Sequence, residues 1–191
     1  MPDYGEGVNP QNEIVLAGPK VEYCETLAGE VTAGSFTNIG YTDKEAGGTL
    51  VDAPPEFQEV FVTGLVDPVK RKGTKKNVTF KFRFNQVNLT NLAIATGQAL
   101  SQKSGEILLG GKVQDAPLYK WRFVVPNDDD STKDITVIIP RGRVIETSEV
   151  KFSDTAPTGV DVTIQALEVV ASGITLNAAQ LAGYRWVAFR S

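Results

Sequence analysis

The stretch Val78-Thr79-Phe80-Lys81-Phe82-Arg83-Phe84 decides the fold class, because apolar and polar side chains alternate through it without a break. Successive side chains of a β-strand point to opposite faces, so the apolar residues share one face and the lysine and arginine share the other. The same alternation recurs in Tyr119-Lys120-Trp121-Arg122-Phe123 and in Val160-Asp161-Val162-Thr163-Ile164-Gln165. The sequence therefore predicts strands with one buried face, which is typical of packed antiparallel sheets.

Other stretches of the chain are rich in β-branched and aromatic residues but alternate less cleanly. We expect strands over residues 57–63, 135–139 and 144–152, and shorter ones over 13–17 and 185–190. The segments between them contain Gly, Pro, Asn and Asp, which favour turns. They predict hairpin loops over 126–131 and 154–159, and longer loops over 43–56 and 64–76.

One helix is predicted between residues 88 and 97. Asn88 is a residue type that caps the free N–H groups of a first turn, and Gly97 suits the left-handed position after a helix end. The side chains expected to face a sheet are Leu89, Leu92, Ala93 and Thr96. We also expect one helical turn within residues 175–181. The predicted fold is thus mainly β, with two packed antiparallel sheets, a β-sandwich or barrel, flanked by one short α-helix.

The composition excludes several classes of function. The chain has 191 residues, 41% of them hydrophobic, which is enough for one ordinary domain with a core. It has no histidine and one cysteine, Cys24, so nucleophile–histidine pairs, histidine metal ligands and cysteine-rich metal sites are excluded. We expect a protein that is not an enzyme, that holds no metal or cofactor, and that buries Cys24 as a small apolar residue.

The sequence shows no targeting or membrane segment. Residues 1–7 lack the basic and apolar regions of a secretory signal, and no stretch has the ~20 apolar residues of a membrane-spanning helix. We expect synthesis in the cytoplasm without membrane insertion. We also expect a single domain over residues 1–191, with 1–12 as an extended arm and 173–191 as a C-terminal extension.

Three short motifs suggest chemistry, and each has a simpler interpretation. Asp128-Asp129-Asp130 offers oxygen ligands but lacks the spacing of an EF-hand, so we interpret it as a solvated hairpin tip. Residues 105–112 are similar to a phosphate-binding loop, but the spacing is wrong and the Ser or Thr is absent, so we reject that function. Residues 70–76 contain five basic residues, yet no nucleic-acid-binding motif accompanies them, so a protein contact or a solvated loop is favoured.

Charge is unevenly distributed along the chain. Residues 1–56 contain ten acidic and two basic residues, a balance of −8, whereas residues 57–87 contain seven basic and two acidic residues, a balance of +5. The whole chain has a formal charge of −4. We therefore expect two oppositely charged surfaces on one subunit. The basic surface is centred on Lys70, Arg71, Lys72, Lys75 and Lys76.

Three stretches between residues 14 and 169 resemble parts of one known family. The first is Leu16-Ala17-Gly18-Pro19-Lys20-Val21-Glu22-Tyr23, followed by Asn38-Ile39-Gly40-Tyr41-Thr42-Asp43. The second is the strand from Val78 with the helix Asn88–Gly97, and the third is Ile138–Val144 with Val150–Ser153 and Val160–Leu167. In this order they are similar to the N-terminal strand and glycine turn, the strand and helix, and a later strand pair of the bacteriophage major tail tube proteins.

The resemblance implies a β-sandwich subunit that forms hexameric rings, and rings that stack into a tail tube through which DNA leaves the virion. The implied partners are further copies of the chain and the tape-measure, tail-tip and tail-terminator proteins, with non-specific passage of DNA. Within such a tube we predict that residues 70–76 contact acidic residues of the neighbouring ring. They should not face the bore, where a cationic wall would hold DNA tightly. Reversing Lys70, Arg71 and Lys72 to Glu is expected to give a folded subunit that does not polymerise.

Other functions are compatible with the same pattern. An Hcp-like tube component of a contractile secretion system shares the implied fold and assembly. A carbohydrate-binding β-sandwich should expose aromatic side chains on one sheet face, whereas the aromatic residues here alternate with charge, as in a one-sided core. A hydrolase on an all-β scaffold is disfavoured by the missing histidine.

Overall fold

The computed structural model describes residues 13–16, 19–40, 42, 47–60, 70–85, 88–111, 115–126, 133–148, 159–170, 173–177 and 179–190. Within these ranges, one large antiparallel sheet contains nine strands. In spatial order they are β1 (Glu13–Leu16), β5 (Gly48–Asp52), β8 (Val78–Phe84), β13 (Val160–Ala166), β12 (Asp134–Thr147), β11 (Tyr119–Pro126), β2 (Lys20–Cys24) and β4 (Thr37–Asn38), and β16 (Val187–Arg190) also pairs with β12.

Strand β8 confirms the alternation predicted for it. All of its apolar side chains are buried, whereas Lys81 between them is exposed. Strand β5 pairs with one edge of β8 and β13 with the other, so that Leu50, Phe80 and Ile164 form one buried row across three strands. Cross-strand rows of this kind are the unit that stabilises a sheet.

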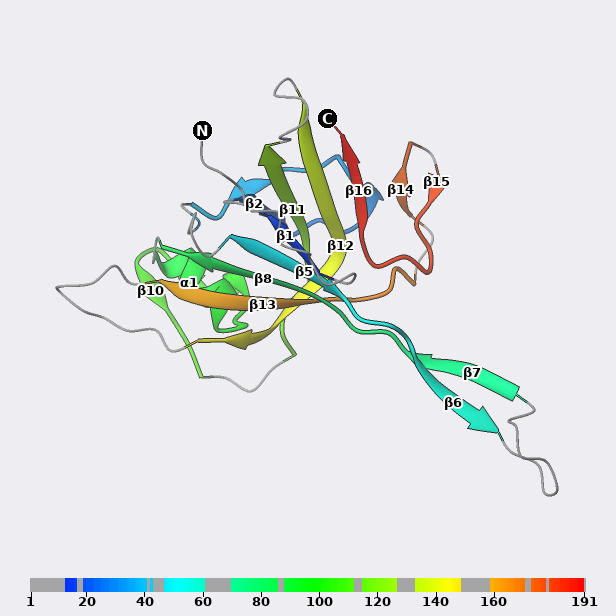
Figure 1. Cartoon of the computed structure of the whole chain (residues 1–191). Coiled ribbons are helices and arrows are strands. Elements are labelled where there is room, and N and C mark those ends of the chain that lie inside the picture. The colour runs from blue at the N-terminus through cyan, green and yellow to red at the C-terminus, as the bar shows by residue number, and fades with distance from the viewer. Residues whose placement is uncertain are drawn as a thin grey trace, which may run out of the picture.

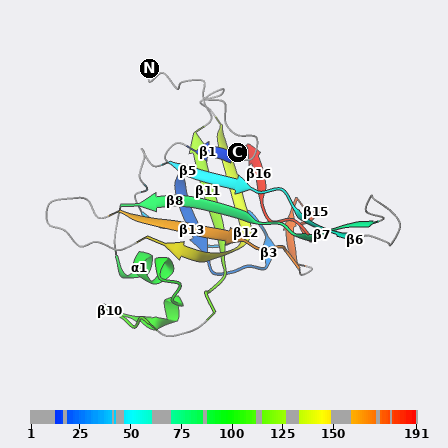
Figure 2. The ribbon, with the colours of Figure 1, turned by 60° about the horizontal axis from the view of Figure 1, so that its bottom comes forward.

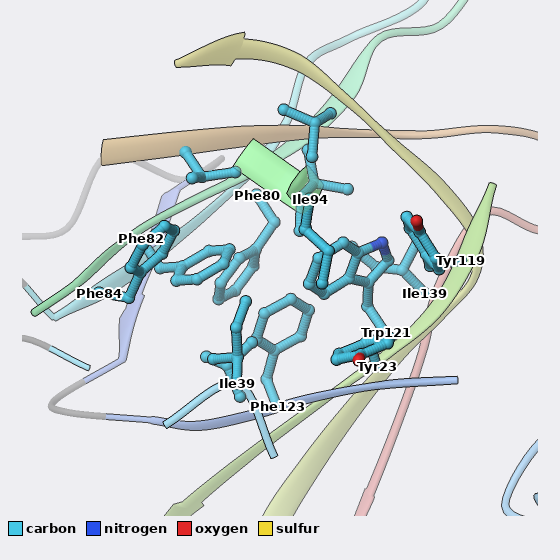
Figure 3. Packing of buried hydrophobic residues seen from close by; sticks show 14 of the residues in the cluster. Tyr23, Ile39, Phe80, Phe82, Phe84, Ile94, Tyr119, Trp121, Phe123 and Ile139 are labelled. Carbon is cyan, nitrogen blue, oxygen red and sulfur yellow. The ribbon is translucent and has the colours of Figure 1, made fainter. Parts of the chain in front are cut away.

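The large sheet folds over on itself, and its two halves pack face to face. Figure 1 shows β8 and β13 crossing the direction of β11 and β12. The ring centroids of Phe80 and Phe123, one from each half, lie 3.6 Å apart, and those of Phe82 and Trp121 lie 6.1 Å apart. Figure 3 shows these rings gathered in one cluster between the strands. The predicted arrangement of two packed antiparallel sheets is therefore confirmed.

Strand β12 joins the two halves, and it corrects the predicted pair of strands over 135–139 and 144–152. The structure has one strand from Asp134 to Thr147, with β16 and then β13 along one edge. The proline in its middle, Pro140, is tolerated because the register with β11 shifts there. Next to it, Gly142 lets the backbone approach the core, since an added Cβ would lie 2.7 Å from Trp121.

Helix α1 (Leu89–Ala95) begins and ends as predicted. The Asn88 side chain accepts a hydrogen bond from the N–H of Asn91, and Gly97 has a φ of +67° just after the helix. The predicted apolar stripe is only partly correct. Ala93 is buried, but Thr96 is exposed and the other buried helix residues are Asn91, Ile94 and Ala95. Figure 2 shows α1 beside the C-terminal part of β12.

A second apolar layer covers the outer face of β11 and β12. It contains a small sheet of β3 (Gly29–Glu30), β14 (Ile174–Leu176) and β15 (Ala179–Gln180), so the helical turn predicted within 175–181 is wrong. Its core consists of Val31, Ile138, Val169, Ile174 and Leu181. Residues of the predicted C-terminal extension thus belong to this layer and, through β16, to the large sheet.

Two further hairpins complete the described structure. Strands β6 (Glu56–Val60) and β7 (Lys70–Lys75) form a two-stranded ribbon that projects from the body (Figure 1). We call this ribbon of β6 and β7 the arm, a name that from here on does not refer to residues 1–12. After a 3₁₀ turn, η1 (Leu100–Gln102), the short strands β9 (Lys103–Ser104) and β10 (Ile107–Leu108) form a hairpin, which agrees with rejecting a phosphate-binding loop there.

The arm and β5 correct two of the predicted loops. Residues 48–52 are strand β5 within the loop expected over 43–56, and residues 70–75 are strand β7 within the loop expected over 64–76. Both hairpin loops do connect antiparallel strands, β11 with β12 and β12 with β13. Residues 127–132, which include the three aspartates, and residues 149–158 lie outside the described residues.

Candidate assembly surfaces

The arm brings opposite charges together on its two strands. The backbone register places Glu59 opposite Arg71 and Glu56 opposite Lys75. Opposite charges at such positions stabilise a ribbon by roughly 0.2–1 kcal/mol for each pair. Part of the basic segment predicted to bind a neighbouring ring therefore pairs in the backbone register with acidic positions of its own chain, which the linear sequence did not reveal.

Two basic residues of the arm have no acid opposite them. Lys72 pairs in register with Gln58, and Lys70 pairs with Val60. In the backbone register, the basic positions 71 and 75 thus lie opposite acidic positions of β6, whereas the basic positions 70 and 72 do not.

The arm also contains an exposed aromatic side chain. Phe57 is 52% exposed and lies opposite Gly73 in the register. An added Cβ on Gly73 would lie 3.8 Å from Cε1 of the Phe57 ring, so the ring covers the glycine backbone. An exposed aromatic residue on a projecting ribbon is a common feature of protein contact sites.

The last basic residue of the predicted site, Lys76, lies at the root of the arm and has a partner within its own chain. Its Nζ is 2.8 Å from Oδ1 of Asp52, at the end of β5. The other carboxylate oxygen, Oδ2, accepts a hydrogen bond from Nε1 of Trp186 at 3.1 Å. The structure therefore places the five predicted residues on one continuous segment but gives Lys76 a different environment from the rest.

The outer face of β8 and β13 is polar and ion-paired. Arg83 donates two hydrogen bonds to the carboxylate of Asp161, at 2.7 and 2.8 Å, and the two side chains are 40% and 51% exposed. On the neighbouring strand, Arg143 donates two hydrogen bonds to Oε1 of Gln165 at 3.1 and 3.0 Å. Both arginines on this face thus have partners that reduce their availability to other anions.

The corresponding face of β2 and β11 is covered, which the sequence did not predict. Lys120 was expected to face solvent, but it is fully buried, and its Nζ donates to the carbonyl oxygens of Glu30 and Ala33 at 3.3 and 3.1 Å. Burial lowers the pKa of Lys120, against the opposing effect of nearby Cys24 and Glu30. Alternation fixed the direction of this side chain but not what lies over it.

A buried ion-pair cluster lies next to Lys120. Glu22 accepts hydrogen bonds from Arg122 and lies 2.8 Å from Nζ of Lys20. Burial acts to raise the pKa of Glu22, but the hydrogen bonds from Arg122 and Lys20 outweigh it and hold the pKa below its usual value. The Arg122 guanidinium lies 4.0 Å from the centroid of the Phe36 ring, which covers the cluster. On this side of the molecule, Phe36 thus covers Arg122, while Lys20 stays exposed.

Several familiar kinds of site are absent from the part of the chain that the structure describes. Within it, no three metal-ligating side chains gather, and no helix is long and apolar enough to cross a membrane. Cys24 is buried and free, as predicted. Most aromatic side chains lie in the core, so the described residues do not form the exposed aromatic row of a carbohydrate-binding face.

Comparison with known proteins identifies the family. The family model described as phage tail tube protein matches residues 17–178. A search among curated proteins finds no match. Among solved structures, the cryo-EM structure of the anti-feeding prophage cap, a tube-terminating cap, is 8% identical with 100% of both chains covered, but its TM-score of 0.39 carries no argument. Because the family model spans most of the sequence, this chain belongs to the phage tail tube protein family and is a structural component of the phage tail.

Proposed function

We propose that six copies of this subunit close into a ring, that the rings stack into the tail tube, and that DNA is ejected through the bore. The observation that supports stacking is the arm, a two-stranded ribbon that extends beyond the packed body (Figure 1). An isolated hairpin is only marginally stable in water, so a projecting ribbon needs a partner surface. In an open-ended stack, each ring offers one kind of surface to the next and receives another.

Charge suggests which surface receives the arm. The bases on β7 outnumber the acids on β6, and residues 1–56 have a strong excess of acid. In the backbone register, Lys70 and Lys72 lie opposite Val60 and Gln58 rather than opposite an acid. We therefore propose that the face of the arm that carries these two lysines docks on acidic residues of the adjacent ring. Screening by salt should weaken such a contact, since the Debye length falls to ~3 Å at 1 M.

The test is a double charge reversal on that face. Lys70→Glu with Lys72→Glu should give a subunit with wild-type circular dichroism that forms rings but no tubes in negative-stain microscopy and sedimentation. The matched control is Lys103→Glu with Lys133→Glu, which makes the same charge change at exposed positions off the arm and should leave tubes normal. Tubes of normal length from the arm variant would refute docking through this face.

The polar face of β8 and β13 supports a proposal for the bore wall. A cationic wall would bind DNA by releasing counterions. On this face Arg83 and Arg143 are paired, and the opposite side of the sandwich is occupied by the second apolar layer. A cysteine at Lys81, which is exposed, should then react with a bulky maleimide in free subunits but not in tubes, whereas a cysteine at Ser101 should react in both. Equal labelling of Lys81→Cys in tubes would refute the assignment.

A further inference from the structure

The β-ladder is interrupted where the arm leaves the body. Asp52 pairs with Val78 on the body side, and Phe57 pairs with Gly73 on the arm side. The arm ladder itself begins with Glu56 opposite Lys75, and its register shifts between Glu56 and Phe57. Between β5 and β6, the N–H of Ala53 still donates to the carbonyl of Asn77 at 3.1 Å, but Pro54 and Pro55 have no N–H to donate. The ladder is therefore weaker at the root than within the body or within the arm.

Side-chain packing does not fill the root either. A cleft of about 250 Å³ lies there, and its lining includes Asp52, Lys76, Tyr184, Arg185 and Trp186. The carboxylate of Asp52 makes two polar contacts at this cleft. Asp52 forms an ion pair with Lys76, which leads into β8, and accepts the indole N–H of Trp186.

The segment that contains Trp186 is itself fixed to the body. Its indole packs against the main core, and the next residues form β16 on the edge of β12. The N–H of Val169 donates to the carbonyl of Tyr184, and the Arg185 guanidinium donates to the carbonyl of Ala166 at the end of β13. Asp52 thus contacts the arm root through its ion pair with Lys76 and the body through its hydrogen bond from Trp186.

We propose that Asp52 is a positioning residue, which fixes the direction of the arm relative to the body through Lys76 and Trp186. This inference rests on the proposed function only in its consequence: the C-terminal segment then sets the arm direction in which rings stack. A single carboxylate has this role because the two prolines and the register shift interrupt the ladder at the root. The remaining constraint at the root is local, so its loss should free the arm while the body stays folded.

The test measures arm direction without assembly. Spin labels at Gln58→Cys on the arm and Ser101→Cys in η1 report the distance distribution between arm and body in dilute subunits, since native Cys24 is buried. The otherwise unchanged chain should give a narrow peak, and Asp52→Ala should lose it. The matched control is Asp161→Asn, which breaks an ion pair of the same sheet away from the root and should keep the narrow peak.

One further variant and an assembly assay keep the inference falsifiable. Trp186→Phe removes the indole donor but keeps an aromatic ring against the core, and it should also broaden the peak, so it serves if Asp52→Ala does not fold. A peak that stays narrow in the folded variants overturns the role of Asp52. In tube assays, Asp52→Ala should give rings with few or short stacks, and normal tubes despite a broad distribution would overturn the link to stacking. If the unmutated chain itself forms no tubes, the proposed function fails while the distance measurement still decides the role of Asp52.

Discussion

The two halves of one hairpin, β5–β8 in the body and β6–β7 in the arm, are held by different forces. In the body half, every second side chain enters the core, and β8 is paired along both edges. In the arm half, the strands pair only with each other, and charged residues dominate β7. Apolar burial therefore stabilises the strand pairing in the body half, whereas the pairing in the arm half depends on a two-stranded ladder of hydrogen bonds.

This difference separates stability from assembly. Apolar burial contributes ~25 cal/mol per Å² and dominates folding, so the body half should determine whether the subunit folds. The arm half consists largely of polar residues and exposes Phe57, so apolar burial there should contribute less to folding. Paired substitutions of the same residue type in the two halves test this division.

The largest expected effect comes from a pair of phenylalanines. Phe80→Ala should lower the free energy of unfolding by about 3–5 kcal/mol, because its ring is fully buried and stacks on Phe123. Phe57→Ala, on the arm, should cost less than about 1 kcal/mol, because the ring is 52% exposed. Urea denaturation of the two variants measures both values. Equal losses would mean that the arm contributes to the folding of the subunit.

A pair of glycines should give the next largest contrast. Gly142→Ala places a Cβ 2.7 Å from Trp121 and 2.8 Å from Ile164, so we expect a loss of about 1–3 kcal/mol from overpacking. Gly73→Ala on the arm meets the Phe57 ring at an ordinary 3.8 Å, and it should be neutral or stabilise by up to ~1 kcal/mol through reduced freedom of the unfolded chain. Thermal unfolding of both variants, compared with the wild type, checks the sign of each change.

The same contrast shows what the sequence can and cannot predict. The alternation in Val78–Phe84 predicted a strand with one buried face, and Asn88 with Gly97 predicted the helix ends, because each of these signals is local. Strand β7 was missed because Lys-Arg-Lys has no apolar alternation, and its order comes from pairing with β6. The helix stripe was partly wrong because the Asn91 side chain is drawn inward by a hydrogen bond to the carbonyl of Ile39.

The candidate site was predictable as a basic segment but not as a surface. Its five basic residues all lie within positions 70–76, so the charge excess is visible in the sequence. The backbone register decides which basic positions of the arm lie opposite acidic ones, and the fold brings Lys76 to Asp52. The sequence specifies neither. For the same reason, burial of Lys120 under residues 30–36 came from tertiary structure alone.

The buried Lys120 predicts how the free energy of unfolding changes with pH. Because burial lowers its pKa below the usual 10.5, the folded state releases this proton at a lower pH than the unfolded state does. Between the two pKa values the unfolded state binds more protons, so this group makes stability rise with pH. Lys120→Met should abolish that rise, and Lys81→Met, at an exposed lysine, should keep it.

The measurement has to be a difference between variants at each pH. Burial also raises the pKa of Tyr23 and Tyr119, so these groups lower stability as the unfolded state ionises above pH 10. Their contribution is common to the wild type and to Lys120→Met and cancels in the comparison. Urea titrations from pH 8 upward should show the wild type gaining stability relative to Lys120→Met as the pH approaches 10.5. A constant difference would contradict a buried charge at this position.

The smallest expected effect concerns the exposed ion pair between Arg83 and Asp161. Although its two hydrogen bonds are short, both side chains are about half exposed, so water and salt reduce its contribution to folding to roughly 0.2–1 kcal/mol. A double-mutant cycle with Arg83→Gln and Asp161→Asn measures this coupling by urea denaturation. If the proposed bore wall is correct, Asp161→Asn should change DNA retention in assembled tubes more than it changes stability, because it removes a carboxylate that balances the charge of Arg83. A coupling well above 1 kcal/mol would instead mean that this ion pair stabilises the subunit as strongly as the buried contacts of the body half.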